Sequence, residues 1–413
     1  MCNQMRKLKN NSKGFSLLVA LISLIIVIVS IFIIKIIYNN VNASRVTRVV
    51  GNNTPPVSYQ TNLGTNTTTV KQPVVSQRIL PPPAGSFNII NYGASTASSN
   101  NKVAIQGAIN AAGKNRGTVF VPVGIFKIAG SLRISSMITL EGSNEAKSIL
   151  LETVHPDDLL SDRANGTTVE NITLNTQEYN GGHAFGTTAS YTRLQNAIIL
   201  SGSSPGHFAL YYAGHPGATP HNPSYSTNNK MINIIENDQI CDDGISWSFQ
   251  ENSSITNLNE TGSRLALYVD KNLLINNYVY HPGVQATSCI HSHNGIPTQG
   301  FWITPPSNDI TINNFDTYGN GGKLSSGKQL YSTNITINNE NFMTNSGYQL
   351  DIGDVNGLTI SNSNFANNKV VINPDVQAIV DIKNSTLSNL VIPTNSLHKI
   401  TLTCLSVSPV ICP

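Results

Sequence analysis

The chain has 413 residues, of which 39% are hydrophobic and 11% charged, with a formal net charge of +3. All 22 acids and 11 of the 25 bases lie in residues 141–413, which therefore carry a formal charge of −11. A body this acidic excludes a general nucleic-acid binder, because neutralising phosphates needs a basic face. A polyanionic sugar would need a bound cation or local Arg and Lys side chains.

A basic leader and a long apolar run predict a membrane anchor. Residues 1–14 carry Arg6, Lys7, Lys9 and Lys13, and residues 15–34 read FSLLVALISLIIVIVSIFII. Twenty such residues in a helix match a hydrocarbon core of roughly 30 Å. The preceding charges favour a cytoplasmic N-terminus. We therefore expect residues 15–38 to span the membrane once. The rest should lie outside the cytoplasm, at the cell surface or in the periplasm, or be secreted if the leader is cleaved.

The leader also offers a second interpretation. Lys13-Gly14 followed by FSLLV resembles the leader of type IV prepilins, which implies processing at that site. That family has a Glu at the fifth mature position, where this chain has Val19. A plain anchor stays the first expectation, with a prepilin-like leader as the alternative.

A linker separates this anchor from the body. Residues 39–86 are rich in Pro, Thr and Asn with few large apolar residues, so they predict an extended, disordered tether. Five cysteines are present. Cys2 lies on the inner side, and Cys404 and Cys412 could close a small loop in an oxidising compartment. That all five are unpaired is the other interpretation.

The body is expected over residues 87–400, followed by a tail over residues 401–413. FNIINYGA at 87–94, AIQGAINAAG at 104–113 and GTVFVPVGIFKIAG at 117–130 open it. These segments resemble the start of the pectin lyase-like superfamily, closest to its rhamnogalacturonase/epimerase-like pectate lyase domain. The resemblance implies a right-handed parallel β-helix with a site in a groove along one sheet. Apolar residues at helical spacing agree, with Asn100 or Asn101 as cap and Gly113 as stop, and predict a short helix that covers the open end. Those apolar residues are Ile105, Ala108, Ile109 and Ala112.

A repeated Ile-Thr-Ile-Asn-Asn pattern predicts the same fold independently. It occurs at Ile255, Leu273, Ile310, Ile335 and Leu358, at separations of 18, 37, 25 and 23 residues. Coils of a β-solenoid need about 20–29 residues, so the long step predicts an inserted loop around residues 280–300. Alternation points the aliphatic residues inward and the Thr outward, and the Asn can turn the chain and stack on the next coil. The fold class is therefore all-β, a single-stranded parallel β-helix.

The segment CDDGISW at 241–247 holds the first catalytic candidates. Asp242 and Asp243 resemble the paired aspartates of polygalacturonase-like glycoside hydrolases, and Asp238 is near in sequence. Inverting hydrolysis needs two carboxyl groups about 6.5–9.5 Å apart. The next coil has Arg264 where that family has a His-containing motif. An Asx turn or a structural Asp243–Arg264 ion pair is the alternative.

Arg264 suggests a second mechanism. Pectate lyases use an arginine as base and carboxylates that hold Ca²⁺, which neutralises a uronate. Asp242, Asp243 and Asp270 could supply the carboxylates beside Arg264. Ca²⁺ is therefore expected only for a lyase, and no cofactor is required for a hydrolase.

Soft ligands gather in the expected long loop. Cys289, His291 and His293 recur at every second residue, and zinc would accept this set with a fourth ligand such as His281. No partner motif accompanies them, so a hydrogen-bonding loop is the plainer interpretation, in which His281 and His293 would contact sugar.

Aromatic residues occur at the coil starts around these loops. Outward aromatics make stacking platforms for sugars, while inward ones fill the core. Counting from Ile245 points Trp247 inward. Tyr211, Tyr212, Tyr268 and Trp302 are the substrate-binding candidates, with Tyr268 and Trp302 preferred.

Two classes of function remain open. The first is a carbohydrate-active enzyme, with a hydrolase preferred to a lyase or epimerase. The second is a non-catalytic β-helix, displayed as an adhesin or a structural glycan-binding protein. Both would have a polysaccharide as partner.

Overall fold

The computed structural model describes residue 75 and residues 78–154, 158–176, 183–202, 208–238, 243–283, 299–327, 330–343, 349–365, 368–392, 399–405 and 407. The chain divides into two compact units, residues 1–67 and 68–413. The predicted anchor over residues 15–38 lies outside the described residues. Among the residues described, no helix is long and apolar enough to cross a membrane.

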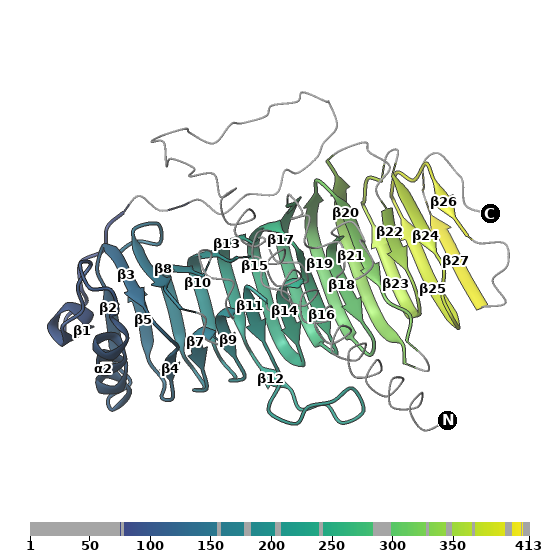
Figure 1. Cartoon of the computed structure of the whole chain (residues 1–413). Helices are drawn as coiled ribbons and strands as arrows, with labels where there is room; N and C mark the ends of the chain where they lie inside the picture. Colours follow the sequence, from purple (N-terminus) through teal and green to yellow (C-terminus); the bar gives the residue numbers. More distant parts are fainter. Residues whose placement is uncertain are drawn as a thin grey trace, which may run out of the picture. The chain divides into compact units, whose positions relative to one another are not determined.

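The described residues form two parallel sheets, and the chain passes repeatedly from one to the other (Figure 1). The first, sheet A, contains 16 strands in the described residues: β1 Phe87–Asn88, β2 Thr118–Val121, β3 Gly124–Ile128, β5 Thr139–Gly142, β6 Ser148–Glu152, β8 Thr168–Asn175, β10 Arg193–Leu200, β12 Ser226–Thr227, β13 Lys230–Asn237, β15 Gln250–Gly262, β17 Lys271–Pro282, β19 Asn308–Thr317, β21 Ser332–Phe342, β23 Val355–Ser361, β25 Gln377–Lys383 and β27 Lys399–Leu405. The second, sheet B, contains 11: β4 Leu132–Ile134, β7 Asp158–Asp162, β9 His183–Thr187, β11 Leu210–Tyr212, β14 Asp243–Ser248, β16 Arg264–Tyr268, β18 Gln299–Thr304, β20 Asn320–Leu324, β22 Gln349–Ile352, β24 Lys369–Ile372 and β26 Leu390–Val391.

Every pairing between these named strands is parallel. From β13 onward, a strand in one sheet is followed by a strand in the other, and the chain then returns to pair with the first one coil further on. Before that point, β1 to β3, β5 and β6, and β12 and β13 are consecutive strands of sheet A. The chain is therefore a parallel β-helix, as predicted.

The alternating aliphatic residues form its core, as the repeat predicts. Ile310 and Ile312 are both 0% exposed, while Thr311 between them is partly exposed. In the next coil Ile335 pairs with Ile310 and is likewise buried. Inward side chains thus stack in columns along the helix axis, which removes apolar surface from water at every coil.

A ladder of asparagines bends each long strand of sheet A. The seven asparagines are Asn171, Asn196, Asn233, Asn257, Asn277, Asn314 and Asn339, all with φ between 47° and 61°. From Asn196 onward each donates its Nδ2 to Oδ1 of the previous one at 2.7–3.1 Å. Asparagine tolerates this left-handed conformation better than other side-chain-bearing residues. The predicted stacking of asparagine amides is confirmed.

The predicted cap is also present. Helix α2 (Lys102–Gly113) follows the 3-10 helix η1 (Ile89–Tyr92) and lies at the β1 end of the coils (Figure 1). Its four expected apolar residues are all buried. Asn101 is the N-cap residue, but the side chain of Asn100 accepts the Lys102 N–H, at 3.0 Å. The helix therefore covers the end of the core that the first coil would expose.

Two predicted boundaries shift. Leu80 N donates to Ser143 O at 2.7 Å, so the end of the expected linker already contacts the body. At the other end, β27 extends to Leu405 in register with β25, so residues 401–405 belong to the β-helix. Cys404 in β27 is disulfide-bonded, and Cys412 lies outside the described residues.

Candidate functional site

A chain of polar and aromatic contacts runs from the first residues of β14 and β16 to Trp302 in β18 and Ser325 after β20. Asp243 opens β14 and Arg264 opens β16, and the two residues are partners in adjacent coils. Arg264 Nε donates to Asp243 Oδ1 at 2.5 Å, and the guanidinium carbon lies 4.0 Å from the centroid of the Trp302 ring. Trp302 in turn donates its indole N–H to Ser325 Oγ. The side chains of Arg264 and Asp243 are 9% and 14% exposed. The ion pair holds the guanidinium of Arg264, and the guanidinium in turn holds the ring of Trp302 through the cation–π contact.

The strand register places this tryptophan in a row that crosses the outer face of sheet B. One residue per strand pairs with the next along the row, which is Ser161, Gly186, Tyr211, Ser246, Ala266, Trp302, Lys323, Asp351 and Val371. Strands lie about 4.8 Å apart, so Tyr211 and Trp302 are separated by roughly 14 Å along the row. Small Ser246 and Ala266 between them leave the two aromatic rings as the raised points of this stretch.

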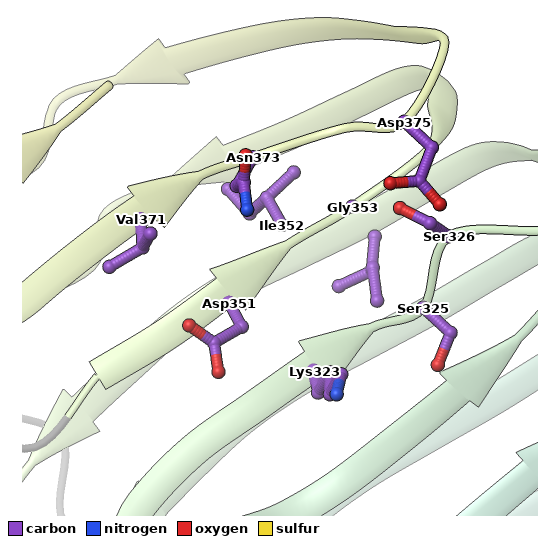
Figure 2. A pocket seen from close by; sticks show the side chains of 10 residues that line it. Lys323, Ser325, Ser326, Asp351, Ile352, Gly353, Val371, Asn373 and Asp375 are labelled. Atoms are coloured by element: carbon purple, nitrogen blue, oxygen red, sulfur yellow. The ribbon is translucent and has the colours of Figure 1, made fainter. Parts of the chain in front are cut away.

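The row ends in a pocket of about 430 Å³ (Figure 2). Lys323, Asp351 and Val371 reach it from β20, β22 and β24, while Ser326 and Asp375 come from the turns beyond the strands. Burial raises the pKa of Asp351, although Gln349 donates to its Oδ2 at 3.1 Å and Lys323 is near. The pocket therefore contains two carboxyl groups, one of which holds its proton to a higher pH than an ordinary aspartate.

A second hollow of about 390 Å³ lies at the opposite end of the same face. Arg133, Asp158, Ser161 and Arg163 are among its lining residues. Asp158 Oδ1 lies 2.6 Å from His183 Nδ1, and the His183 ring stacks on Tyr211 with 4.8 Å between centroids. Phe208 stacks on both rings at 5.4–5.6 Å. The outer face of sheet B thus carries both hollows and the partly exposed aromatic groups between them.

Three predicted site residues meet at this face. Asp243, Arg264 and Trp302 are in contact as described, and Tyr211 occupies the same row. The Asp243–Arg264 ion pair, given above as an alternative to catalysis by the aspartates, is present. Asp242, Cys289, His291 and His293 lie outside the described residues, so their predicted roles stay predictions.

Tyr212 is wrongly predicted as a substrate-binding residue. It pairs with Trp247 in the next coil, both are 0% exposed, and their rings lie 4.2 Å apart in the core. The inward direction predicted for Trp247 is confirmed. Tyr212 shares it because the two residues are in register.

The other candidates lie elsewhere. Tyr268 closes β16 at the end opposite Arg264 and contacts Phe249 edge to face, at 5.5 Å. His281 is in sheet A, half-buried against Tyr318, and burial lowers its pKa. Asp238 is only 3% exposed and accepts the Ser263 N–H, so it lies beneath the surface instead of on it.

Asp270 does not join the predicted calcium set. It is fully buried at the far end of β16, where its Oδ1 accepts the Gln250 N–H at 2.8 Å. Arg264 lies at the opposite end of that strand and is paired with Asp243. The structure therefore separates the carboxylate from the arginine that the lyase interpretation groups together.

Sequence reasoning did not find Asp351 and Asp375. Asp351 follows Leu350 in a strand without the Ile-Thr-Ile pattern, and Asp375 lies in a turn with Pro374. Alternation around the buried Leu350 and Ile352 could have pointed Asp351 outward.

Comparison with solved structures finds several chains that are similar to this one. The catalytic domain of a GH87 alpha-1,3-glucanase in complex with nigerose matches with a TM-score of 0.51 and 13% identity, over 81% of this chain and 66% of that one. The A-module of a mannuronan C-5 epimerase from Azotobacter vinelandii matches with a TM-score of 0.47 and 13% identity, over 78% of this chain and 100% of that one. Tailspike protein 2 of an Escherichia coli O157:H7 bacteriophage matches with a TM-score of 0.46 and 13% identity, over 78% of this chain and 42% of that one.

The match to the glucanase catalytic domain agrees with the predicted parallel β-helix fold. No family model matches the chain, and a search of curated protein sequences finds no match.

Proposed function

We propose that this chain is a glycoside hydrolase that holds a polysaccharide across the outer face of sheet B. The observation that carries the proposal is the register row that joins Tyr211 and Trp302 to a pocket with two carboxyl groups. Aromatic faces stack on sugar rings, and polar groups fix their hydroxyls. The similarity to a glucanase is one of fold alone. A polysaccharide substrate is compatible with that fold.

The pocket supplies the chemistry of hydrolysis. Glycosidic hydrolysis needs a protonated carboxyl group to donate to the leaving oxygen and a second carboxylate to activate water or attack the sugar. Asp351 suits the first role because burial raises its pKa, and Asp375 is the second carboxyl group of the pocket. Trp302, one strand away from Lys323, would hold the sugar next to the pocket.

Asp243 and Arg264 take a positioning role in this proposal. Their ion pair uses the carboxylate of Asp243 and keeps the guanidinium charged over Trp302. A charged, paired arginine is a poor base, which weighs against a lyase or an epimerase at this position.

A binding protein without turnover is the second candidate. It is favoured by the Asp243–Arg264 ion pair, because a carboxylate held by an arginine is not available for catalysis. The aromatic residues then remain as groups that can bind sugar. In that case the chain would act as a surface adhesin. In either case the placement outside the cytoplasm, with residues 15–38 in the membrane, is a proposal that rests on the leader and the apolar run.

The two candidates differ in products and in their response to Asp351. The full chain and the Asp351→Asn and Asp375→Asn variants are incubated with a panel of neutral and acidic polysaccharides. New reducing ends and unsaturated sugars are assayed separately. A hydrolase releases reducing ends only, and Asp351→Asn lowers the rate at least about 100-fold while binding persists. Binding with no product from any polymer supports the adhesin, and an ultraviolet-absorbing product supports a lyase.

A further inference from the structure

Three carboxyl groups meet in the interior of the β-helix. Glu236 in β13 pairs with Glu260 in β15, and Asp238 follows directly after β13. Their exposed fractions are 0%, 0% and 3%. One oxygen from each lies within 4.8 Å of the others, and this is the one such group of three among the described residues.

Few hydrogen-bond donors reach this acidic cluster, defined as Glu236, Asp238 and Glu260. Ser263 N–H donates to Asp238 Oδ1 at 3.0 Å, and the Tyr278 hydroxyl donates to Glu260 Oε2. Within the described part of the chain, no donor from outside the cluster reaches either oxygen of Glu236 or Oε1 of Glu260, and the hydrogen bond between Glu236 and Asp238 forms only when one of them holds a proton. Buried carboxyl oxygens are normally satisfied, so these three atoms require another partner.

Two glycines make room for the cluster. A Cβ added at Gly244 would lie 2.1 Å from Asp238 Oδ2 and 3.1 Å from Glu260 Oε1. One added at Gly262 would lie 2.3 Å from Asp238 Oδ1. A side chain at either position would therefore collide with the carboxyl group of Asp238.

Among the described residues, neither Glu236 nor Glu260 forms an ion pair with a basic side chain. The guanidinium of Arg264, the nearest base in sequence, is already held by Asp243. Three ionised carboxylates in one buried site repel one another, which leaves protonation or a bound cation as remedies. A single Ca²⁺ bonds to oxygens at 2.3–2.6 Å, so ligands on its opposite sides are about 4.8 Å apart. The separations in the cluster fit that limit.

We propose that Glu236, Asp238 and Glu260 bind one hard divalent cation, with Ca²⁺ as the expected ion. The donor set is all oxygen, which suits Ca²⁺ and Mg²⁺ and disfavours zinc. This site is distinct from the predicted calcium set with Asp270, and it does not depend on hydrolysis.

The cation would stabilise the start of two strands of sheet B. Asp238 bonds to Ser263, which directly precedes Arg264, and Gly244 beside Asp238 directly follows Asp243. An ion on Asp238 therefore holds the turns that present the Asp243–Arg264 pair. Loss of the ion should loosen that pair and the ring of Trp302.

Because the site is buried, the test must exchange the ion through the unfolded state. The full chain is unfolded in denaturant with EDTA, freed of chelator, and refolded with Ca²⁺, with Mg²⁺ or with neither. Metal content is measured by mass spectrometry after removal of free ions, and the midpoint of thermal unfolding is recorded. We expect about one Ca²⁺ per chain and a midpoint raised by about 5 °C over the metal-free protein.

Matched variants separate the cluster from an ordinary buried acid. Glu236→Gln should reduce bound Ca²⁺ at least tenfold and remove the shift in midpoint. Glu340→Gln changes another Glu that is 0% exposed, outside the cluster, and should keep both. Glu260→Gln replaces Glu236→Gln if the latter does not fold.

The result that overturns the proposal is refolded wild-type chain without bound metal and with the same midpoint in all three conditions. The cluster would then be held by shared protons. Binding of Mg²⁺ in preference to Ca²⁺ would keep the site and correct the ion.

Discussion

At the scale of single residues, the Asp243–Arg264 pair differs in burial from the Lys271–Glu251 pair. Its side chains are 9% and 14% exposed, whereas those of Lys271 and Glu251 are 47% and 25% exposed. Removing one member of a buried pair leaves a desolvated charge behind, while an exposed pair is screened by water. The two pairs therefore make a matched comparison.

We expect Asp243→Asn to lower the free energy of unfolding by about 3 kcal/mol, because Arg264 loses its anion in a largely buried site. Glu251→Gln should have little effect. Urea unfolding of both variants, followed by far-ultraviolet circular dichroism, measures the difference. Equal stability of the two variants would mean that water compensates Arg264.

Glu340 predicts a pH dependence of stability. Burial raises the pKa of Glu340 to about 8, against an ordinary value of 4.5. Below pH 4.5 the group is protonated in both the folded and the unfolded chain. Between pH 4.5 and 8 only the unfolded chain releases the proton, so the contribution to stability is lost as the pH rises to about 8.

Glu340→Gln should therefore be increasingly stable relative to the wild type from pH 5 to pH 9, by a difference on the order of a few kcal/mol. Unfolding free energies at several pH values, compared within each pH, isolate this residue from the other acids. Parallel curves for the two proteins would show that Glu340 is ionised in the folded chain.

Sequence reasoning reached some of these residues and missed others for a physical reason. Alternation within one strand placed Trp247 correctly, but the direction of Tyr212 depended on the register between coils. Glu236 follows the consecutive Ile234 and Ile235, so alternation alone could not say which of these isoleucines faced inward. Burying a carboxyl group is also costly, so sequence reasoning would place Glu236 on the surface.

At the scale of the elements, the asparagine ladder is the feature that sequence predicted best. Asn277, Asn314 and Asn339 each follow an aliphatic-x-Ile-Asn segment, and their left-handed φ ends the pleat there. Register then resumes one residue later, for example from Thr256 paired with Asn276 to Leu258 paired with Tyr278. The pattern therefore fixed both the strand and its bend.

Asn277 allows its two contributions to be separated. Asn277→Gly keeps access to φ of 58° and loses the amide bonds to Asn257 and Asn314. Asn277→Ala loses the same bonds and must also place a β-carbon in the left-handed region, which costs about 1–2 kcal/mol more. Denaturant unfolding should rank the wild type first, the glycine variant second and the alanine variant third.

If the alanine variant equals or exceeds the glycine variant in stability, backbone conformation contributes little there. The hydrogen bonds alone would then explain the ladder.

Loops between the sheets were the elements that sequence placed least well. The 37-residue step located the insertion between β17 and β18 from spacing alone, yet spacing carries no information on its conformation. Residues 401–405 read as a tail because Thr401 and Thr403 dilute the apolar pattern, although β27 pairs with β25 throughout. Pairing to an existing sheet edge supplied the order that local sequence lacked.

At the scale of the whole β-helix, function depends on which face carries the aromatic groups. Sheet A carries the asparagine ladder, while sheet B presents Tyr211, Trp302 and the two hollows on its outer face. The repeat predicted the fold but treats both faces alike, so it could not choose between them. The choice needed the register of sheet B.

The chain contains two tryptophans, and only Trp302 lies on that face, because Trp247 is 0% exposed in the core. Intrinsic fluorescence therefore reports sugar contact at a single position. The Trp302→Phe variant, which keeps an aromatic ring, is the control that assigns the signal.

The most direct test of the account is acrylamide quenching of this fluorescence, titrated with fragments of the polysaccharide that the chain binds. We predict that sugar protects the fluorescence of the wild type from quenching and that Trp302→Phe abolishes this change. Sugar binding demonstrated by calorimetry, without any protection of Trp302, would contradict a glycan lying across sheet B.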